Sequence, residues 1–167
     1  MTDEIDRALR RGEAGLREAF ARYTIARRAR LDDHASNAAV EAAMWVTALD
    51  DLREQTSGDV GRYRARRDAD DNGCVVLGLR WVRNHGVHAL VNHQQWSEDQ
   101  GFNFPLNFPA NAEWHIRWGP IPSQVQRRKD DARSFDGYVQ QLQGHWVDDT
   151  LQAAARWLGV MLVAPGE

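Results

Sequence analysis

The sequence predicts a mainly α-helical protein, an up-and-down bundle of four or more helices with an aromatic and proline-rich insertion before the last helix. Apolar residues recur at helical spacing over four separate stretches, whereas only one short segment alternates apolar and polar residues as a strand does. The chain has 167 residues, which is enough for one compact domain with a real core. We therefore expect a single domain over residues 1–167.

The first two expected helices differ in how much of their surface is apolar. One runs from Asp3 to about Arg30, where apolar residues form a single face between arginines and glutamates. The next runs from Ser36 to about Gln55 and is apolar nearly all round, which predicts a central helix enclosed by others. Its expected N-cap is Ser36 or Asn37.

A polar segment from Thr56 to Gly73 follows, and its glycines predict a connection between helices. Clustered arginines beside a tyrosine are suited to following a phosphate backbone, as in proteins that bind single strands. The RNA-binding candidates in this segment are Arg62, Arg64, Arg66 and Arg67. The alternative that we favour is neutralisation of these arginines by the aspartates that follow them.

The third expected helix covers the stretch from Gly78 to Leu90 and carries several polar side chains. At about 100° per residue, Arg83 falls on the same line as Leu79 and Val87, so an arginine occupies the middle of an apolar stripe. A guanidinium that faces a core needs a carboxylate, backbone carbonyls or a phosphate, because an unpaired charge there is strongly destabilising.

Two aspartates at the end of the second helix are candidate partners for this arginine. Asp51 continues the line of Val40 and Met44, while Asp50 lies on the face of Val46, so periodicity does not decide between them. An alternative of equal weight is that both aspartates mark the point where the helix emerges into solvent.

The insertion, residues 92–130, is too aromatic for a disordered linker and too rich in proline for a helix. Within it, residues Trp114 to Trp118 alternate apolar and polar side chains, which predicts a short strand and half of a β-hairpin. One interpretation is a lid or base-stacking wall beside the third helix. We favour the other, a satellite cluster that covers one flank of the bundle.

The last expected helix runs from Asp131 to about Met161 and has one apolar face. Gly137 and Gly144 lie within it. Glycine lowers helix propensity and permits a close helix approach or a bend.

Composition limits the compartment and the partners. Cys74 is the single cysteine, the chain opens without the apolar run of a signal peptide, and no apolar stretch approaches a membrane span. We therefore expect a protein of the reduced cytoplasm with no membrane partner. The net charge of −3 means that any nucleic acid is contacted through local basic patches.

The order Arg83-Asn84-His85-Gly86-Val87-His88 resembles the Arg-x4-His motif of HEPN domains (higher eukaryotes and prokaryotes nucleotide-binding), including the polar residue after the arginine. The resemblance covers the core helices and not residues 92–130. It implies an all-α bundle that acts as a metal-independent ribonuclease, with no cofactor and an active site formed where two protomers of a homodimer meet. It also suggests a toxin or defence role, with an antitoxin protein as a partner.

RNA cleavage by attack of the 2'-hydroxyl needs a proton acceptor, a proton donor and a cation for the charge of the phosphorane. Histidine titrates near neutrality, and arginine presents a permanent planar fork to phosphate oxygens. The resemblance implies that His88 and its symmetry mate are the acid and base and that Arg83 stabilises charge. Asn84 would orient the phosphate or the His88 ring, and His85 is an additional candidate. The expected products are a 2',3'-cyclic phosphate and a 5'-hydroxyl.

Three alternatives compete with this interpretation. His85, His88 and His93 are suited to holding a zinc ion, although no His-Glu-x-x-His signature accompanies them. A non-catalytic HEPN-like module would use the same cleft to bind nucleotide or RNA, or only to dimerise. The last alternative is an ordinary helix with a core histidine and a paired arginine.

Overall fold

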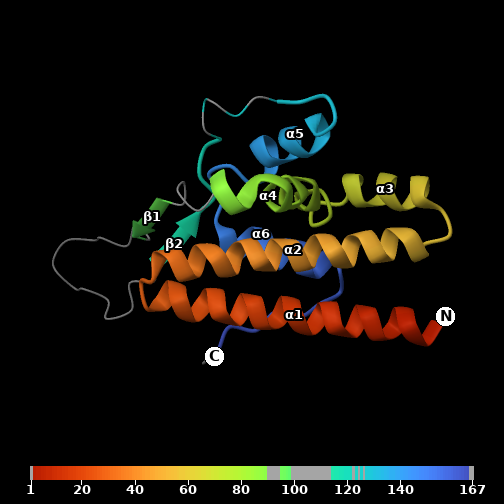
Figure 1. Cartoon of the computed structure of the whole chain (residues 1–167), viewed down its shortest axis with the longest axis horizontal. Helices are drawn as coiled ribbons and strands as arrows, with labels where there is room; N and C mark the ends of the chain where they lie inside the picture. Colours follow the sequence, from red (N-terminus) through yellow and green to blue (C-terminus); the bar gives the residue numbers. More distant parts are fainter. Residues whose placement is uncertain are drawn as a thin grey trace.

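The computed structural model describes residues 2–89, 95–98, 114–121, 123, 125 and 127–165, and within these residues it contains six α-helices and one two-stranded sheet (Figure 1). The mainly α-helical fold class expected from the sequence is therefore confirmed. None of the described helices is long and apolar enough to cross a membrane.

Two long antiparallel helices, α1 (Thr2–Arg28) and α2 (Asp32–Thr56), lie side by side along the molecule (Figure 1). The turn between them is tight because Arg30 adopts the left-handed conformation with φ 57°, and the Leu31 amide donates to the Ala26 carbonyl at 2.9 Å. The expected start of α2 at Ser36 was wrong. The helix begins four residues earlier, where Asp32 and Asp33 complement the positive helix end, and Ser36 is buried inside it.

The segment expected to be a connection contains a helix, α3 (Val60–Ala69). Its start is capped by the Asp59 side chain, which accepts a hydrogen bond of 2.9 Å from the backbone amide of Arg62. Only Tyr63 and Arg67 of this helix are buried. A helix that buries one aromatic ring and one charged side chain has no apolar periodicity to reveal it.

The next two helices, α4 (Val75–Ala89) and α5 (Ala132–Gln141), cross at a pair of glycines. A Cβ atom built on Gly78 would lie 3.0 Å from the carbonyl oxygen of Gly137 and 2.5 Å from a methyl carbon of Leu142. The close approach anticipated from Gly137 is therefore made against α4.

The single last helix expected from 131 to 161 is divided, because α5 ends at Gln141 and α6 (Val147–Trp157) begins after a break. Gly144 in the break has φ 79°, a left-handed conformation that glycine adopts without strain. The Gly144 amide donates to the carbonyl of Trp118, and the Trp118 amide donates to the carbonyl of His145. Hydrogen bonds to the insertion thus replace those of a continuous helix.

The expected strand at Trp114 is present as β2 (Trp114–Arg117), which pairs antiparallel with β1 (Gln95–Glu98). Ile116 and Trp118 are buried, and the Trp118 indole donates to the Thr150 hydroxyl of α6 at 2.7 Å. This end of the insertion packs on the core. Residues 119–121, 123, 125 and 127–130 of the segment are also described, whereas the tract between the two strands, on which the lid interpretation depends, lies outside the described residues.

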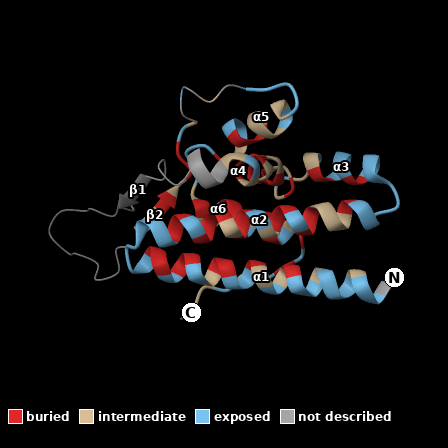
Figure 2. Cartoon of the chain, viewed as in Figure 1, coloured by how far each residue is buried: buried red, intermediate tan, exposed pale blue. Residues whose placement is uncertain are grey.

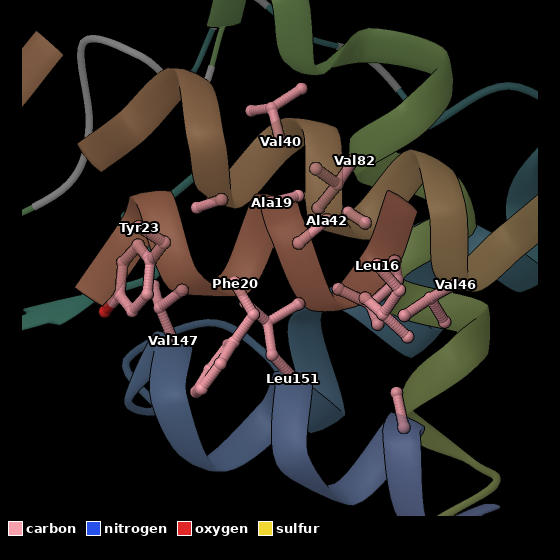
Figure 3. Packing of buried hydrophobic residues seen from close by; sticks show 14 of the residues in the cluster. Leu16, Ala19, Phe20, Tyr23, Val40, Ala42, Val46, Val82, Val147 and Leu151 are labelled. Carbon is pink, nitrogen blue, oxygen red and sulfur yellow. The ribbon is translucent and has the colours of Figure 1, made fainter. Parts of the chain in front are cut away.

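Buried side chains of α1, α2, α4, α5, α6 and β2 form one core cluster (Figure 2). In its centre, Phe20 and Tyr23 of α1 point toward Val147 and Leu151 of α6, and Leu16 lies beside Val46 of α2 (Figure 3). The core thereby holds α2 between α1 and α4, with α6 packed behind them, which brings the charged end of α2 against α3 and α4.

The crossing at Gly78 leads to a stability prediction. Gly78→Ala should lower the free energy of unfolding by about 1–3 kcal/mol, because the new methyl group overlaps Leu142 and the α5 backbone. The control is Gly61→Ala in α3, where a Cβ meets only the Asp59 carboxylate at 3.5 Å and the gain in helix propensity is about 0.5–1 kcal/mol. Urea denaturation measures both. Equal effects of the two substitutions would contradict the packing described for α4 and α5.

Candidate functional site

Helix α4 positions the candidate residues against the end of α2. Its buried line passes through Val76, Leu79 and Val82, which pack into the core. Arg83 was expected in the middle of this line, but it lies at its edge, with 32% of its side chain exposed. These three apolar residues are spaced by three and share one face of the helix. Arg83 follows Val82 directly, about 100° further round the helix, and therefore lies at the rim of the contact between α2 and α4.

Arg83 pairs with Asp51 and not with Asp50. Its Nη1 donates to a carboxylate oxygen of Asp51 at 2.8 Å, and its Nε donates to the side-chain oxygen of Asn84 at 3.1 Å. Asp51 also contacts Arg80, at 2.6 Å. Two guanidinium groups thus share one carboxylate, and Arg83 is held in place while a third of its side chain stays open to solvent.

Asp50, one residue earlier, is completely buried and accepts four hydrogen bonds. One carboxylate oxygen accepts from Arg67 and from Arg80, each at 2.7 Å; the other accepts from the Tyr63 hydroxyl at 2.8 Å and the Trp157 indole at 3.2 Å. We call these residues the Asp50 cluster. They contradict the alternative in which both aspartates mark the emergence of α2 into solvent.

The cluster controls the ionisation of its own members. Burial alone would raise the pKa of Asp50, but the hydrogen bond from Arg80 and the charge of Arg67 outweigh it and hold the pKa below its usual value. Burial raises the pKa of Tyr63 to about 12, with a further contribution from its hydrogen bond to Asp50. Asp50 is therefore a carboxylate and Tyr63 a neutral donor at physiological pH.

A second ring of charges surrounds the Asp50 cluster. Glu54 accepts from Arg64 at 2.6 Å and from Arg67 at 3.4 Å, and the hydrogen bond from Arg64 lowers the pKa of Glu54. Asp68 pairs with Arg67 and with Arg133 of α5. The network as a whole contains Arg64, Arg67, Arg80, Arg83 and Arg133 with Asp50, Asp51, Glu54 and Asp68, which leaves one positive charge in excess.

The four arginines proposed to bind RNA fall into two groups. Arg64 and Arg67 are engaged by carboxylates, and Arg67 is only 2% exposed, so its guanidinium lies where no phosphate backbone reaches it. Arg62 and Arg66 form no ion pair with any residue that the structure describes. The partners that neutralise the run come mainly from α2, and only Asp68 comes from the aspartates that follow it.

Sequence reasoning missed the buried Arg67 and the partly buried Arg80 as partners of Asp50. The available signal was Asp50 itself, a carboxylate at the end of a helix that is apolar over most of its middle. It indicated that a cation was needed but not which of the nearby arginines would supply it.

His85 contacts its own helix, α4, and the residue that precedes α5. Its Nδ1 lies 3.2 Å from the carbonyl oxygen of Trp81, its Nε2 lies 3.1 Å from a carboxylate oxygen of Asp131, and its ring stacks on the Trp81 indole. Both ring nitrogens therefore face acceptors. To bind a zinc ion, His85 would have to give up one of these contacts, so its geometry is that of an anchor between α4 and the start of α5.

His88 lies on the same continuous helix as Arg83, because α4 extends to Ala89. Five residues of helix separate the two positions by about 7.5 Å along the axis and about 140° around it. Asn84 is exposed beside Arg83. The side chain of His88 and all of His93 lie outside the described residues, and so does the proposed zinc trio.

Comparisons with known proteins found no matching family model, no similar curated protein and no similar solved structure. The resemblance to HEPN domains therefore depends on the spacing of Arg83 and His88, the polar residue between them and the helical setting.

The Asp50 cluster predicts a large difference between two adjacent substitutions. Asp50→Asn should lower the free energy of unfolding by about 3–5 kcal/mol, because it leaves the guanidinium groups of Arg67 and Arg80 without their buried counter-charge. Asp51→Asn should cost no more than about 1 kcal/mol, because Asp51 is 31% exposed. Chemical denaturation of both variants tests this. Equal losses would show that Asp50 is not the centre of the network.

The lowered pKa of Asp50 gives this difference a pH dependence. A carboxyl group whose folded pKa lies below its unfolded value contributes stability above the unfolded pKa, about 4, and loses it as pH falls through the folded pKa. The stability gap between the natural chain and Asp50→Asn should therefore stay constant near neutrality and narrow below about pH 4. Denaturation at a series of pH values measures it. A gap that widens on acidification would contradict the direction of the shift.

Proposed function

We propose that the protein is a metal-independent endoribonuclease of HEPN type, which cleaves RNA by attack of a 2'-hydroxyl on the adjacent phosphate. The observation that carries the proposal is the state of Arg83. It is held by Asp51 and Asn84 through two of its nitrogens, and its third nitrogen, Nη2, donates to no residue that the structure describes. An arginine that is oriented in this way and exposed to solvent can donate a hydrogen bond from Nη2 to a phosphate oxygen.

The chemistry is divided between residues of one helix. His88 takes the proton from the 2'-hydroxyl or returns one to the leaving 5'-oxygen, and its symmetry mate in a homodimer performs the other step. Arg83 stabilises the charge on the phosphorane, and Asn84 orients the phosphate. The products are a 2',3'-cyclic phosphate and a 5'-hydroxyl. No metal or cofactor takes part.

The electrostatics of the network support this assignment. Asp51 could neutralise a single arginine, but it is shared by Arg80 and Arg83. Part of the positive charge of the network therefore lies at its exposed edge, beside Asn84. An anion approaching α4 meets an arginine that is already ordered, which lowers the conformational entropy lost on binding.

A second function is favoured by the same ion pair. Because the contact with Asp51 satisfies Arg83 without any phosphate, the helix is also suited to a non-catalytic, dimeric HEPN-like module that binds nucleotide, RNA or a partner protein. For the catalytic function we propose a cytoplasmic toxin or defence protein, with an antitoxin protein as an additional partner.

The ribonuclease proposal is tested by substitution at the two motif positions. His88→Ala and Arg83→Ala should each lower the rate of RNA cleavage in EDTA by about 100-fold or more, because one removes a proton carrier and the other a phosphate cation. The matched control is His34→Ala, an exposed histidine on α2 that should leave the rate unchanged. Cleavage of mixed RNAs on denaturing gels gives the rate, and light scattering checks the dimer.

The outcomes separate the alternatives. Cleavage that survives both substitutions removes the mechanism. Suppression by EDTA together with stoichiometric zinc would favour the metal site instead. RNA binding without any cleavage by the natural chain would favour the non-catalytic module.

A further inference from the structure

A cavity of about 530 Å³ lies between the last turn of α2 and the first turns of α3, away from Arg83 and Asn84. Three arginines line it: Arg53 from α2, and Arg62 and Arg66 from α3. Its volume is within the range of about 300–1,000 Å³ that is usual for sites of small ligands. A cavity of this size with three guanidinium groups is suited to an anion.

Helix α3 separates its arginines by face. Arg64 and Arg67 turn toward α2, where Glu54 and Asp50 accept their hydrogen bonds. Arg62 and Arg66, four residues apart and therefore on one face, turn toward the cavity and form no ion pair with the described residues. The carboxylates of α2 thus neutralise the arginines on one face of α3, while the arginines on its other face, Arg62 and Arg66, keep their positive charge.

The guanidinium of Arg66 is ordered by aromatic rings. It lies 5.2 Å from the centre of the Trp157 ring and 5.9 Å from that of Tyr63, both within the range of cation–π attraction. Tyr63 itself lines the cavity and is anchored by its hydroxyl, which donates to Asp50. The wall of the cavity is therefore attached to the Asp50 cluster.

Arg53 adds a third positive charge to the cavity. Its Nε is buried and donates to no atom that the structure describes, although its Nη2 lies 3.6 Å from Glu13. A buried donor without an acceptor is unfavourable by about 1–3 kcal/mol. Because this Nε is not exposed to the cavity, what Arg53 offers an anion there is its positive charge.

The groups that oppose an anion are already engaged. Asp59 is the one carboxylate that lines the cavity, and it accepts from the Arg62 amide as the cap of α3. The hydroxyls of Thr56 and Ser57 donate to carbonyl oxygens in the last turn of α2, which reduces the negative charge at that helix end. Three cations therefore face one carboxylate.

We propose that this cavity binds a phosphate group, carried either by a free nucleotide or by an RNA strand. Guanidinium forks match phosphate oxygens in charge and in geometry, and the cavity has room for a nucleoside beside the phosphate. The site is separate from the proposed catalytic residues and does not depend on ribonuclease activity.

Calorimetric titration tests the proposal. The His88→Ala variant of the whole 167-residue chain is titrated with inorganic phosphate, with AMP and with a short single-stranded RNA, so that no RNA is cleaved during the measurement. The double substitution Arg62→Ala and Arg66→Ala should weaken binding of the best probe at least about tenfold, because it removes two charge-assisted contacts. The control is Arg64→Ala, which removes one positive charge from the same helix outside the cavity and should change the affinity less than about twofold. Circular dichroism checks that all variants fold.

Each outcome has one meaning. Tight binding of AMP supports a nucleotide site, and binding of RNA alone supports a site for its phosphate backbone. Equal losses in the double variant and in Arg64→Ala, or no saturable binding of any of the three probes, would overturn the proposal. Because binding is measured without cleavage, failure of the ribonuclease proposal would not produce either of these results.

Discussion

The structure depends on one buried carboxylate. Asp50 is fully enclosed on the buried face of α2, and an ion in such a place is tolerated only with complete compensation. The compensation comes from Tyr63 and Arg67 of α3, Arg80 of α4 and Trp157 of α6. Three helices must therefore dock on α2 in one arrangement to satisfy it. Apolar packing alone would tolerate small rotations of these helices, whereas four hydrogen bonds to one carboxylate do not.

Both proposed sites follow from that arrangement. With Arg80 directed at Asp50, the next turn of α4 brings Arg83 to Asp51, at the edge of the network, where it is ordered and partly exposed. With Arg67 directed at Asp50, α3 has one face against α2, and the opposite arginines, Arg62 among them, line the cavity. Some of the basic residues, such as Arg67 and Arg80, thus stabilise the buried network, while others, such as Arg62 and Arg83, lie at the proposed ligand sites.

The network also distinguishes roles among residues that look alike in the chain. Arg67 and Arg66 are adjacent, yet the first is a buried counter-ion and the second stacks on Trp157 beside a cavity. His85 belongs with the structural group, since its two ring nitrogens contact Trp81 and Asp131. A count of arginines and histidines in a motif therefore overestimates how many of them are free to meet a substrate.

The amino-acid pattern by itself determined the helical class, the approximate extents of α1, α2 and α4, and the strand at Trp114, and it named Asp50 and Asp51 as candidate partners of Arg83 without deciding between pairing and emergence into solvent. Each of these features can be predicted from one short stretch of sequence, because it depends on the spacing of apolar residues or on a charged residue within an apolar face. Only the tertiary structure decided that α3 is a helix, that the last helix is divided at Gly144, and which arginine pairs with Asp50. These features depend on contacts between segments that are distant in the chain, such as the hydrogen bonds of Trp118 with Gly144 and His145 between α5 and α6. The periodicity of apolar residues does not reveal such contacts.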